Sequence, residues 1–458
     1  MPKLFGCLLA VIIFIGCSPK SSTEVKTTSK PVRLITLDPG HFHAALIQKV
    51  MYDNIDSTVY VFAPEGPDLK MHLDRINEYN TRAENPTHWN EVIFAGDHFL
   101  ERMLQEKPGN VVMLAGKNRE KTQYILKSLH AGLNVYADKP MVVDAAGFED
   151  LKKAFDIAKE KNLMLYDIMT ERFEITTVLQ RELSVMPAIF GELEKGTPEN
   201  PGIVKESVHH FYKNVSGNVL VRPAWFLDTE QQGEGIIDVM THLVDLVQWE
   251  AFPDQPIDYK KDITITSARR WTTDIPLSKF KTITRLDAFP DYLKRNIVGD
   301  SILKVSSNGE VNYQLRGINA KTSVIWNYES EDGSGDTHYS IMRGTRANLV
   351  IKQGKEEQYK VTLYIEPVVK LTKAYEETVN NGFNSLKKFY EGIELVRMDK
   401  GWRVSIPEKY KDGHEAHFGK VTDKFIDYFI HNSMPEWEVP NMLAKYYTTT
   451  KALEMSKK

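Results

Sequence analysis

Residues 110–140, NVVMLAGKNREKTQYILKSLHAGLNVYADKP, contain a complete strand–helix–strand unit. Val111–Leu114 is a short unbroken apolar run, which is typical of a strand buried on both faces of a parallel sheet. A helix with apolar residues at helical spacing follows, and Gly132 is placed to end it. A second strand, residues 134–137, runs into Asp138-Lys139-Pro140. The unit predicts a parallel sheet, and such sheets bind ligands beyond the carboxyl ends of their strands.

The order of these features resembles the Gfo/Idh/MocA family of glucose–fructose oxidoreductases and inositol dehydrogenases. That family usually has Glu-Lys-Pro where this chain has Asp138-Lys139-Pro140, and Thr-Pro-Asn where it has Gly116-Lys117-Asn118. Later segments match too, so the resemblance covers most of residues 31–370. It implies an α/β protein in which a Rossmann dinucleotide-binding domain precedes an α/β domain with a large, mostly antiparallel sheet. Without its flanking pattern, Lys139 would be interpreted as an exposed lysine at a strand end.

Composition limits the classes of function. The chain has 458 residues, a length that suggests two or three domains. Its 58 basic and 62 acidic residues give a net charge of -4, which offers no case for nucleic-acid binding. The only cysteines, Cys7 and Cys17, lie in the first seventeen residues, so the folded body can hold neither a disulfide nor a cysteine metal site.

The N-terminus reads as a lipoprotein signal peptide. Residues 1–17 combine a positive start at Lys3 with an apolar stretch too short to span a bilayer comfortably. Phe14-Ile15-Gly16-Cys17 resembles a bacterial lipobox with Cys17 as the lipidated residue, and an ordinary secretory signal is the alternative. Residues 18–30 are rich in Ser, Thr and Lys and predict a flexible tether. We therefore expect a periplasm-facing protein of the bacterial cell envelope whose only membrane contact is its lipid anchor.

Residues 31–168 form the predicted Rossmann domain, whose first turn should carry the glycine-rich fingerprint G-x-G-x-x-G. The turn instead reads Asp38-Pro39-Gly40-His41-Phe42-His43-Ala44-Ala45, where only Gly40 survives. Backbone amides there can still approach a pyrophosphate at a helix N-terminus. His41 and His43 could donate to phosphate or substrate, or they could be turn histidines that pack on the sheet edge.

The acidic residue expected after the second strand, residues 57–62, is Glu65. A carboxylate in this place takes the adenosine ribose hydroxyls, which favours NAD over NADP, and a solvated loop carboxylate is the alternative. Residues 70–89 read as a polar insertion. The predicted cofactor contacts are Gly40, His41, Phe42, His43, Glu65, Gly116, Asn118, Asp138 and Lys139.

Residues 233–250, GEGIIDVMTHLVDLVQWE, predict a largely buried helix opened by two glycines. Asp238, His242 and Asp245 fall at i, i+4 and i+7 and so share one face. Three ionisable groups on a buried stripe need partners, because unpaired burial is costly. The resemblance implies a D-x-x-x-H pair here that faces the nicotinamide, and a structural Asp–His contact is the alternative.

These residues predict the oxidation of a secondary alcohol, which removes hydride from carbon and a proton from oxygen. His242 is the predicted general base, because the ordinary pKa of histidine, about 6.5, lies near working pH. Asp238 would orient His242 or stabilise its imidazolium, and Lys139 would hold the reacting oxygen. A nicotinamide would take the hydride.

Predicted substrate contacts come from residues 169–458, the expected substrate and oligomerisation domain. Glu171 and Arg172 follow the last strand of the first sheet and suit either substrate contact or a salt-bridged hinge. Trp225, in a turn before the catalytic helix, could stack on a sugar face or pack in the core.

Residues 371–458 form a C-terminal extension in which His414 and His417 lie three apart. They could face the substrate from one side of a helix, and helix-cap or core histidines and a metal pair are the alternatives. H-E-x-H is not the zinc motif H-E-x-x-H and no third ligand is evident, so no metal site is predicted.

Alternating stretches in residues 257–366 predict the large antiparallel sheet, which in this family also carries subunit contacts, so we expect a homo-oligomer. The predicted function is NAD-dependent oxidation of a sugar, glycoside or cyclitol hydroxyl, or reduction of the ketone, with a tightly held and recycled cofactor. Glycoside cleavage through transient oxidation and non-catalytic sugar binding are the alternatives.

Overall fold

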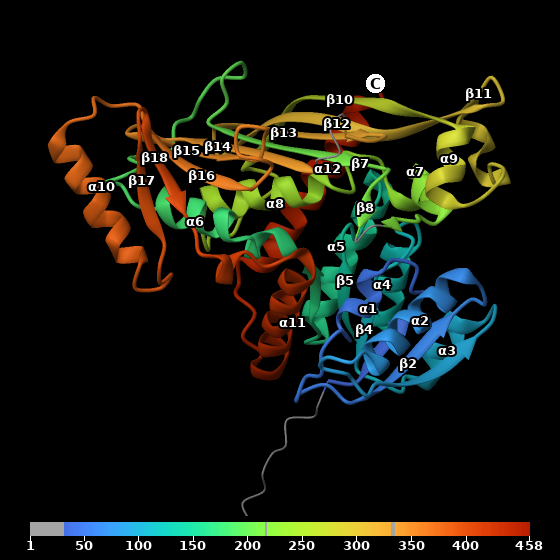
Figure 1. Cartoon of the computed structure of the whole chain (residues 1–458). Coiled ribbons are helices and arrows are strands. Elements are labelled where there is room, and N and C mark those ends of the chain that lie inside the picture. Colours follow the sequence, from blue (N-terminus) through green and yellow to red (C-terminus); the bar gives the residue numbers. More distant parts are fainter. Residues whose placement is uncertain (1–31, 216–217, 331–334) are drawn as a thin grey trace, which may run out of the picture. The chain divides into compact units, whose positions relative to one another are not determined.

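The computed structural model describes residues 32–215, 218–330 and 335–458 (Figure 1). The predicted signal peptide, the lipidated Cys17 and the tether lie outside these residues. Within the described part of the chain, no helix combines the length and the apolarity needed to cross a membrane.

The first half of the chain builds a six-stranded sheet in the order β3-β2-β1-β4-β5-β6, and every neighbouring pair is parallel. The strands are β1 (Leu34–Leu37), β2 (Thr58–Ala63), β3 (Asn90–Ala95), β4 (Val111–Leu114), β5 (Asn134–Asp138) and β6 (Leu165–Ile168). The strand order reverses between β1 and β4, so their carboxyl ends border the crevice where sheets of this kind bind ligands. The predicted Rossmann-like sheet is confirmed.

The helices of this half are α1 (His43–Leu46), α2 (Pro67–Thr81), α3 (Phe99–Glu106), α4 (Lys121–His130) and α5 (Ala145–Glu160). The prediction of a polar insertion at residues 70–89 was wrong, because α2 occupies much of that stretch. Its buried residues, Leu69, His72, Ile76 and Tyr79, recur every three or four positions, and an otherwise polar surface hides this pattern in the sequence.

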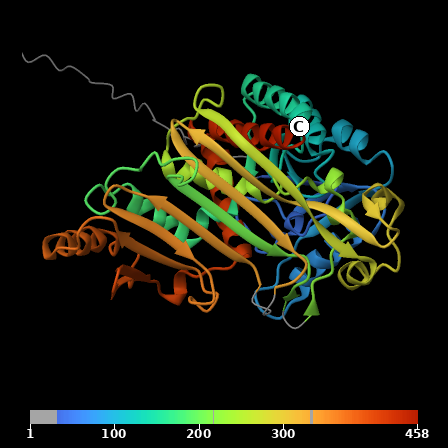
Figure 2. The same cartoon turned by 90° about the horizontal axis from the view of Figure 1, so that it is seen from above.

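The second half builds a ten-stranded sheet in the order β10-β12-β13-β7-β14-β15-β16-β18-β17, with β11 paired to β12. All pairs are antiparallel except β13 with β7, so the predicted mostly antiparallel sheet is confirmed. Figure 2 shows its strands in front of the helices that they cover. The strands are β7 (Ile203–His210), β10 (Ile263–Pro276), β11 (Ile297–Val298), β12 (Ile302–Leu315), β13 (Ile318–Asn327), β14 (Thr337–Arg343), β15 (Ala347–Lys352), β16 (Thr362–Pro367), β17 (Glu394–Met398) and β18 (Gly401–Ser405), and β8 (Asn214–Val215) pairs separately with β9 (Asn218–Val219).

The sequence predicts two strands, at 301–306 and 311–317, where the structure has the single strand β12. Gly309 suggests a turn in the sequence but lies within the strand. A Cβ atom on it would lie 2.3 Å from Cγ1 of Ile236, so this glycine permits a close approach instead of a reversal.

The helices of the second half are α6 (Ile175–Ser184), α7 (Thr229–Gln232), α8 (Met240–Ala251), α9 (Leu277–Thr284), α10 (Lys373–Leu386), α11 (His414–His431) and α12 (Glu438–Ser456), with short 3-10 turns η1 (Thr170–Phe173), η2 (Ala224–Leu227), η3 (Asp291–Asn296) and η4 (Glu408–Tyr410). The helix predicted from Gly233 onward begins only at Met240. Asp238 therefore lies in the turn that precedes α8, and Gly235 serves a close approach, because a Cβ atom there would lie 2.0 Å from the Ser307 carbonyl oxygen.

The last two helices pack against the first sheet as well as the second half. Phe418 and Phe425 of α11, with Tyr446 of α12, belong to the apolar core that contains β1, β4 and β5. The rings of Phe425 and Tyr136 stack with centroids 4.3 Å apart. The C-terminal extension therefore completes the core of the N-terminal half, and the two halves share one compact body.

A buried ion network fixes this arrangement. Arg172 donates to both carboxylate oxygens of Asp245, at 2.6 and 2.7 Å, and to Glu438 of α12 at 3.1 Å. Lys445 lies 2.8 Å from both Asp245 and Asp167. The network joins the junction of the halves, α8 and the C-terminal helix.

Replacing Arg172 by methionine leaves Asp245 and Glu438 with uncompensated buried charge. We expect Arg172→Met to lower the free energy of unfolding by about 3–5 kcal/mol, as measured by denaturant titration. The control is Lys70→Met, which breaks the exposed Lys70–Asp74 pair and is expected to change the free energy by under about 0.5 kcal/mol. Equal denaturation midpoints for the two variants would show that the network adds no stability.

Candidate active site

A cavity of about 530 Å³ is lined by residues from both halves of the molecule. The first half supplies the β1–α1 turn and the carboxyl end of β5. The second half supplies α8, α11 and the strands β7 and β14. The cavity lies at the carboxyl ends of the parallel strands, which is where such folds usually bind ligands.

Lys139, directly after β5, and Asp238, before α8, form an ion pair across the cavity wall. Lys139 Nζ donates to Asp238 Oδ1 at 2.6 Å, and Gln232 donates to the other carboxylate oxygen at 3.1 Å. Burial lowers the pKa of Lys139, but the charges of Asp238 and Asp138 raise it by a larger amount, so the net shift is upward. Burial raises the pKa of Asp238, but the charge of Lys139 lowers it by more, so the net shift is downward. Both partners therefore stay charged.

His242 lines the same cavity from α8 and is 8% exposed. Its Nδ1 atom has no hydrogen-bond partner among the described residues. Burial, aided by the charge of Lys139, lowers its pKa to about 3, so its imidazole is neutral near neutral pH. The sequence predicts that Asp238 serves His242, but the structure pairs Asp238 with Lys139.

The β1–α1 turn uses its backbone donors internally. The amides of Gly40 and His41 both donate to the Ala115 carbonyl oxygen at the end of β4, at 3.2 and 3.1 Å. A Cβ atom on Gly116 would lie 2.3 Å from the Asp38 carbonyl oxygen, so the turns after β1 and β4 touch. These amides are therefore not free for the pyrophosphate contact that the sequence predicts.

Side chains beside this turn offer other hydrogen-bond donors that suit a phosphate group. His41 and Phe42 separate the main cavity from a smaller one of about 130 Å³, which is also lined by His72 and Arg75. His72 is 5% exposed, and both of its ring nitrogens lack partners among the described residues. A buried imidazole N–H without a partner, beside an arginine, fits an anionic group, so this pocket suits a phosphate of a dinucleotide through side chains instead of amides.

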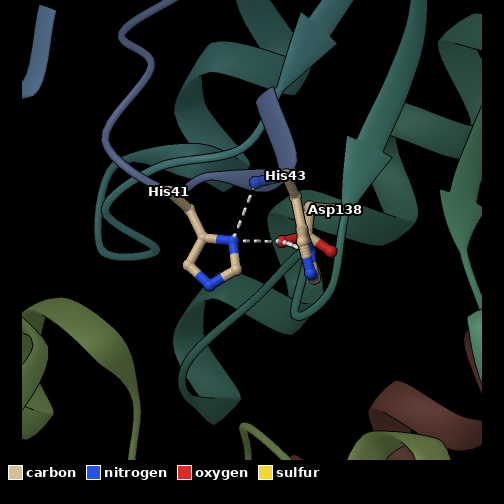
Figure 3. Close-up of side chains that lie close together, drawn as sticks. All are labelled: His41, His43 and Asp138. Carbon is tan, nitrogen blue, oxygen red and sulfur yellow. Dashed lines mark hydrogen bonds and ion pairs between the residues drawn. The ribbon is translucent and has the colours of Figure 1, made fainter. Parts of the chain in front are cut away.

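Figure 3 shows His41, His43 and Asp138 gathered at the ends of β1 and β5. His43 Nδ1 lies 3.0 Å and His41 Nδ1 lies 3.6 Å from Asp138 Oδ2. On its other side, His43 Nε2 contacts His414 Nε2 at 2.8 Å. Glu171 lies 3.9 Å from His414, and both residues line the cavity with His417.

Four other predicted residues lie outside the main cavity. Glu65 is exposed after β2, and Arg172 belongs to the buried ion network. Asn118 joins the halves by donating to the Gln232 carbonyl oxygen at 2.7 Å. Trp225 is buried, packs near Gly40 and donates to Asp68 at 3.2 Å.

Sequence reasoning missed the far wall of the cavity. Ser207 Oγ lies 2.5 Å from His209 Nε2 and 3.2 Å from His338 Nδ1, and His209 Nδ1 lies 2.9 Å from Asp336. The alternation of β7 places Ser207 and His209 on one face and could have revealed them. Asp336 and His338 carry no local signal, because only sheet pairing brings them there.

The buried histidines predict how stability depends on pH. Burial lowers the pKa of His242 to about 3 and of His72 and His414 to about 4, against about 6.5 when unfolded. Between these values the unfolded chain binds more protons, so the free energy of unfolding falls as pH is lowered from about 7 to about 5. Burial also lowers the pKa of His41, His209 and His417, which adds to this trend. It raises the pKa of Glu91 to about 7 and raises that of Asp38, Asp167, Glu250 and Asp423, which opposes the trend. Denaturant titrations across this range check the prediction, which a constant or rising stability on acidification would contradict, and His242→Gln should flatten the slope.

The chain matches a family and several solved structures. The family model described as "Putative oxidoreductase C terminal domain" matches residues 179–457. A crystal structure of a "putative oxidoreductase" from Parabacteroides merdae is 57% identical, with a TM-score of 0.92 over 93% of this chain and 98% of that one. No curated protein sequence matches the chain.

More distant structures share the fold. A "putative myo-inositol dehydrogenase" from Sinorhizobium meliloti is 12% identical, with a TM-score of 0.54 over 93% of this chain and 97% of that one. KijD10, a 3-ketoreductase from Actinomadura kijaniata solved with NADP and TDP-benzene, is 13% identical, with a TM-score of 0.53 over 91% and 96%. These likenesses show that the chain shares its two-half fold with both proteins.

Proposed function

Because the chain belongs to the oxidoreductase family that this C-terminal domain defines, we propose that it oxidises a secondary hydroxyl, or reduces the corresponding ketone, of a sugar, glycoside or cyclitol with a nicotinamide dinucleotide. One observation carries the proposal. Lys139 of one half meets Asp238 and His242 of the other in a single cavity. Two proteins that share the fold, a 3-ketoreductase and a protein described as a myo-inositol dehydrogenase, support the same reaction class.

Each side chain has a role that follows from its environment. The ammonium of Lys139, held by Asp238, donates to the reacting oxygen and stabilises the negative charge that develops on it. His242 takes the hydroxyl proton, since its neutral imidazole is buried with a free nitrogen. Asp238 positions Lys139 and keeps it charged. Glu171, 3.9 Å from His414, supplies carboxylate oxygens at the cavity wall that suit further substrate hydroxyls.

A nicotinamide ring supplies the hydride acceptor when a dinucleotide is bound. His41 and Phe42 would adjoin it, and His72 and Arg75 would hold its phosphates. We propose NAD, with NADP as the alternative, held tightly and recycled on the enzyme by a second substrate or within one cycle.

Native mass spectrometry of the mature protein tests the proposal and the expected homo-oligomer together. We expect a mass increment of one dinucleotide per chain and a subunit number above one. Protein that carries no dinucleotide, and takes none up from solution, would overturn the cofactor assignment.

We also propose that Cys17 anchors the protein in the bacterial envelope, facing the periplasm. The support is the lipobox-like Phe14-Ile15-Gly16-Cys17. In cell fractionation, Cys17→Ser should move the protein out of the membrane fraction, and an unchanged distribution would contradict the anchor.

A further inference from the structure

We propose that His41, His43 and Asp138 form a binding site for a single divalent transition-metal ion, in the turn where the glycine-rich fingerprint would otherwise lie. One donor atom from each residue lies within 4.8 Å of the other two. Two histidines and one carboxylate are a ligand set that Zn²⁺, Fe²⁺ and related ions accept while keeping open positions.

The donor separations fit a common ion. With metal–ligand bonds of about 2.1 Å, two donors lie roughly 3.0 Å apart at a right angle and roughly 3.4 Å apart at the tetrahedral angle. His43 Nδ1 and His41 Nδ1 lie 3.0 and 3.6 Å from Asp138 Oδ2. Both separations from Asp138 therefore suit a shared ion, which would displace the 3.3 Å contact between the His43 amide and His41 Nδ1.

The surroundings hold these ligands in place. His43 and Asp138 are 5% and 4% exposed, so their side chains have few alternative positions. His43 uses its second nitrogen, Nε2, on His414 at 2.8 Å. Metal-binding histidines usually make such an outer contact, which orients the ring and selects its tautomer.

Nearby lysines set a limit on the affinity. Lys121 Nζ donates to the Asp138 carbonyl oxygen at 2.8 Å, and Lys139 follows directly in the chain. Their charges oppose a cation, but Asp238 neutralises Lys139 at 2.6 Å, and Glu171 adds negative charge on the His414 side. Asp138 itself offsets part of the ion's charge.

The open positions of the ion would face the main cavity, because His41 and His43 line it. An ion there suits a substrate with two neighbouring oxygens, such as a vicinal diol or a hydroxyketone, that can chelate it. This use rests on the proposed function, whereas the metal site itself does not.

Cobalt(II) is a suitable probe, because its visible absorption reports nitrogen and oxygen ligands. The full chain is stripped with a chelator and titrated with Co²⁺, and Zn²⁺ is then added as a competitor. We expect one Co²⁺ per chain, and at least roughly a 100-fold weaker affinity in His41→Ala and in His43→Ala. His414→Ala, which removes only the outer contact, should weaken binding by about 10-fold.

His431→Ala is the matched control, because His431 lies 3.0 Å from Asp427 in an exposed His–Asp pair outside the cluster and should leave the affinity unchanged. Thermal unfolding without metal shows that each variant folds, and the part-exposed His41 makes its variant the safest test. Absence of saturable Co²⁺ binding, or equal affinity in wild type and His41→Ala, would overturn the site. The readout involves no dinucleotide, so it separates this proposal from the redox function.

Discussion

Lys139→Met is expected to lower kcat by about 100- to 1,000-fold, the usual effect of removing one donor that stabilises a developing oxyanion. Methionine keeps the length of the side chain but leaves Asp238 without its 2.6 Å partner and the reacting oxygen without a donor. Nicotinamide absorbance, followed in single turnovers with a panel of sugars and glycosides, measures the rate of hydride transfer.

The matched control for Lys139 is Lys153→Met. Lys153 also pairs with an aspartate, Asp150 at 2.8 Å, but it is exposed on α5 and should leave kcat unchanged. A Lys139→Met enzyme whose kcat stays within a few-fold of wild type would remove this lysine from the chemistry.

His242→Gln is the second variant with a large expected effect. Glutamine keeps hydrogen-bonding capacity but cannot take a proton, so we expect kcat to fall by about 100- to 10,000-fold with little change in KM. The pKa of His242 is lowered to about 3 by burial and Lys139, so its base form persists in acid and this group should not reduce the wild-type rate down to about pH 5.

His130→Gln, at the exposed end of α4, is the control for this variant and should behave like wild type. If His242→Gln oxidised substrate at the wild-type rate, the proton acceptor would have to be another cavity group. His414 or Glu171 would then be the next candidates.

Local features of the sequence are enough to single out Lys139, for which we propose the oxyanion-stabilising role. A strand–helix–strand unit identifies the end of β5, and Lys139 lies directly beyond it. His242 can be singled out for a similar reason, since a polar side chain buried in an apolar helix is costly unless it has a partner or a function. Lys139 and His242 are far apart in the chain, so only the family resemblance predicts that they meet in one cavity.

Other features depend on distant partners that local pattern cannot reveal. Asp238 is predicted to serve His242 from helical spacing, but the helix begins after it and the carboxylate turns to Lys139. The sequence leaves open whether Arg172 contacts substrate or is structural. Its partner Glu438, 266 positions away, decides the matter only in the structure. The far wall with His338 requires knowledge of strand pairing.

The packing of α11 and α12 on the first sheet has a consequence for biosynthesis. Domains at the start of a chain commonly fold while translation continues. Here Tyr136 and its neighbours in the core lack the packing contacts of Phe425 and Tyr446 until the final segment has been made. The N-terminal half should therefore stay incompletely folded until the C-terminal segment is present, and prematurely terminated chains should be good substrates for proteases.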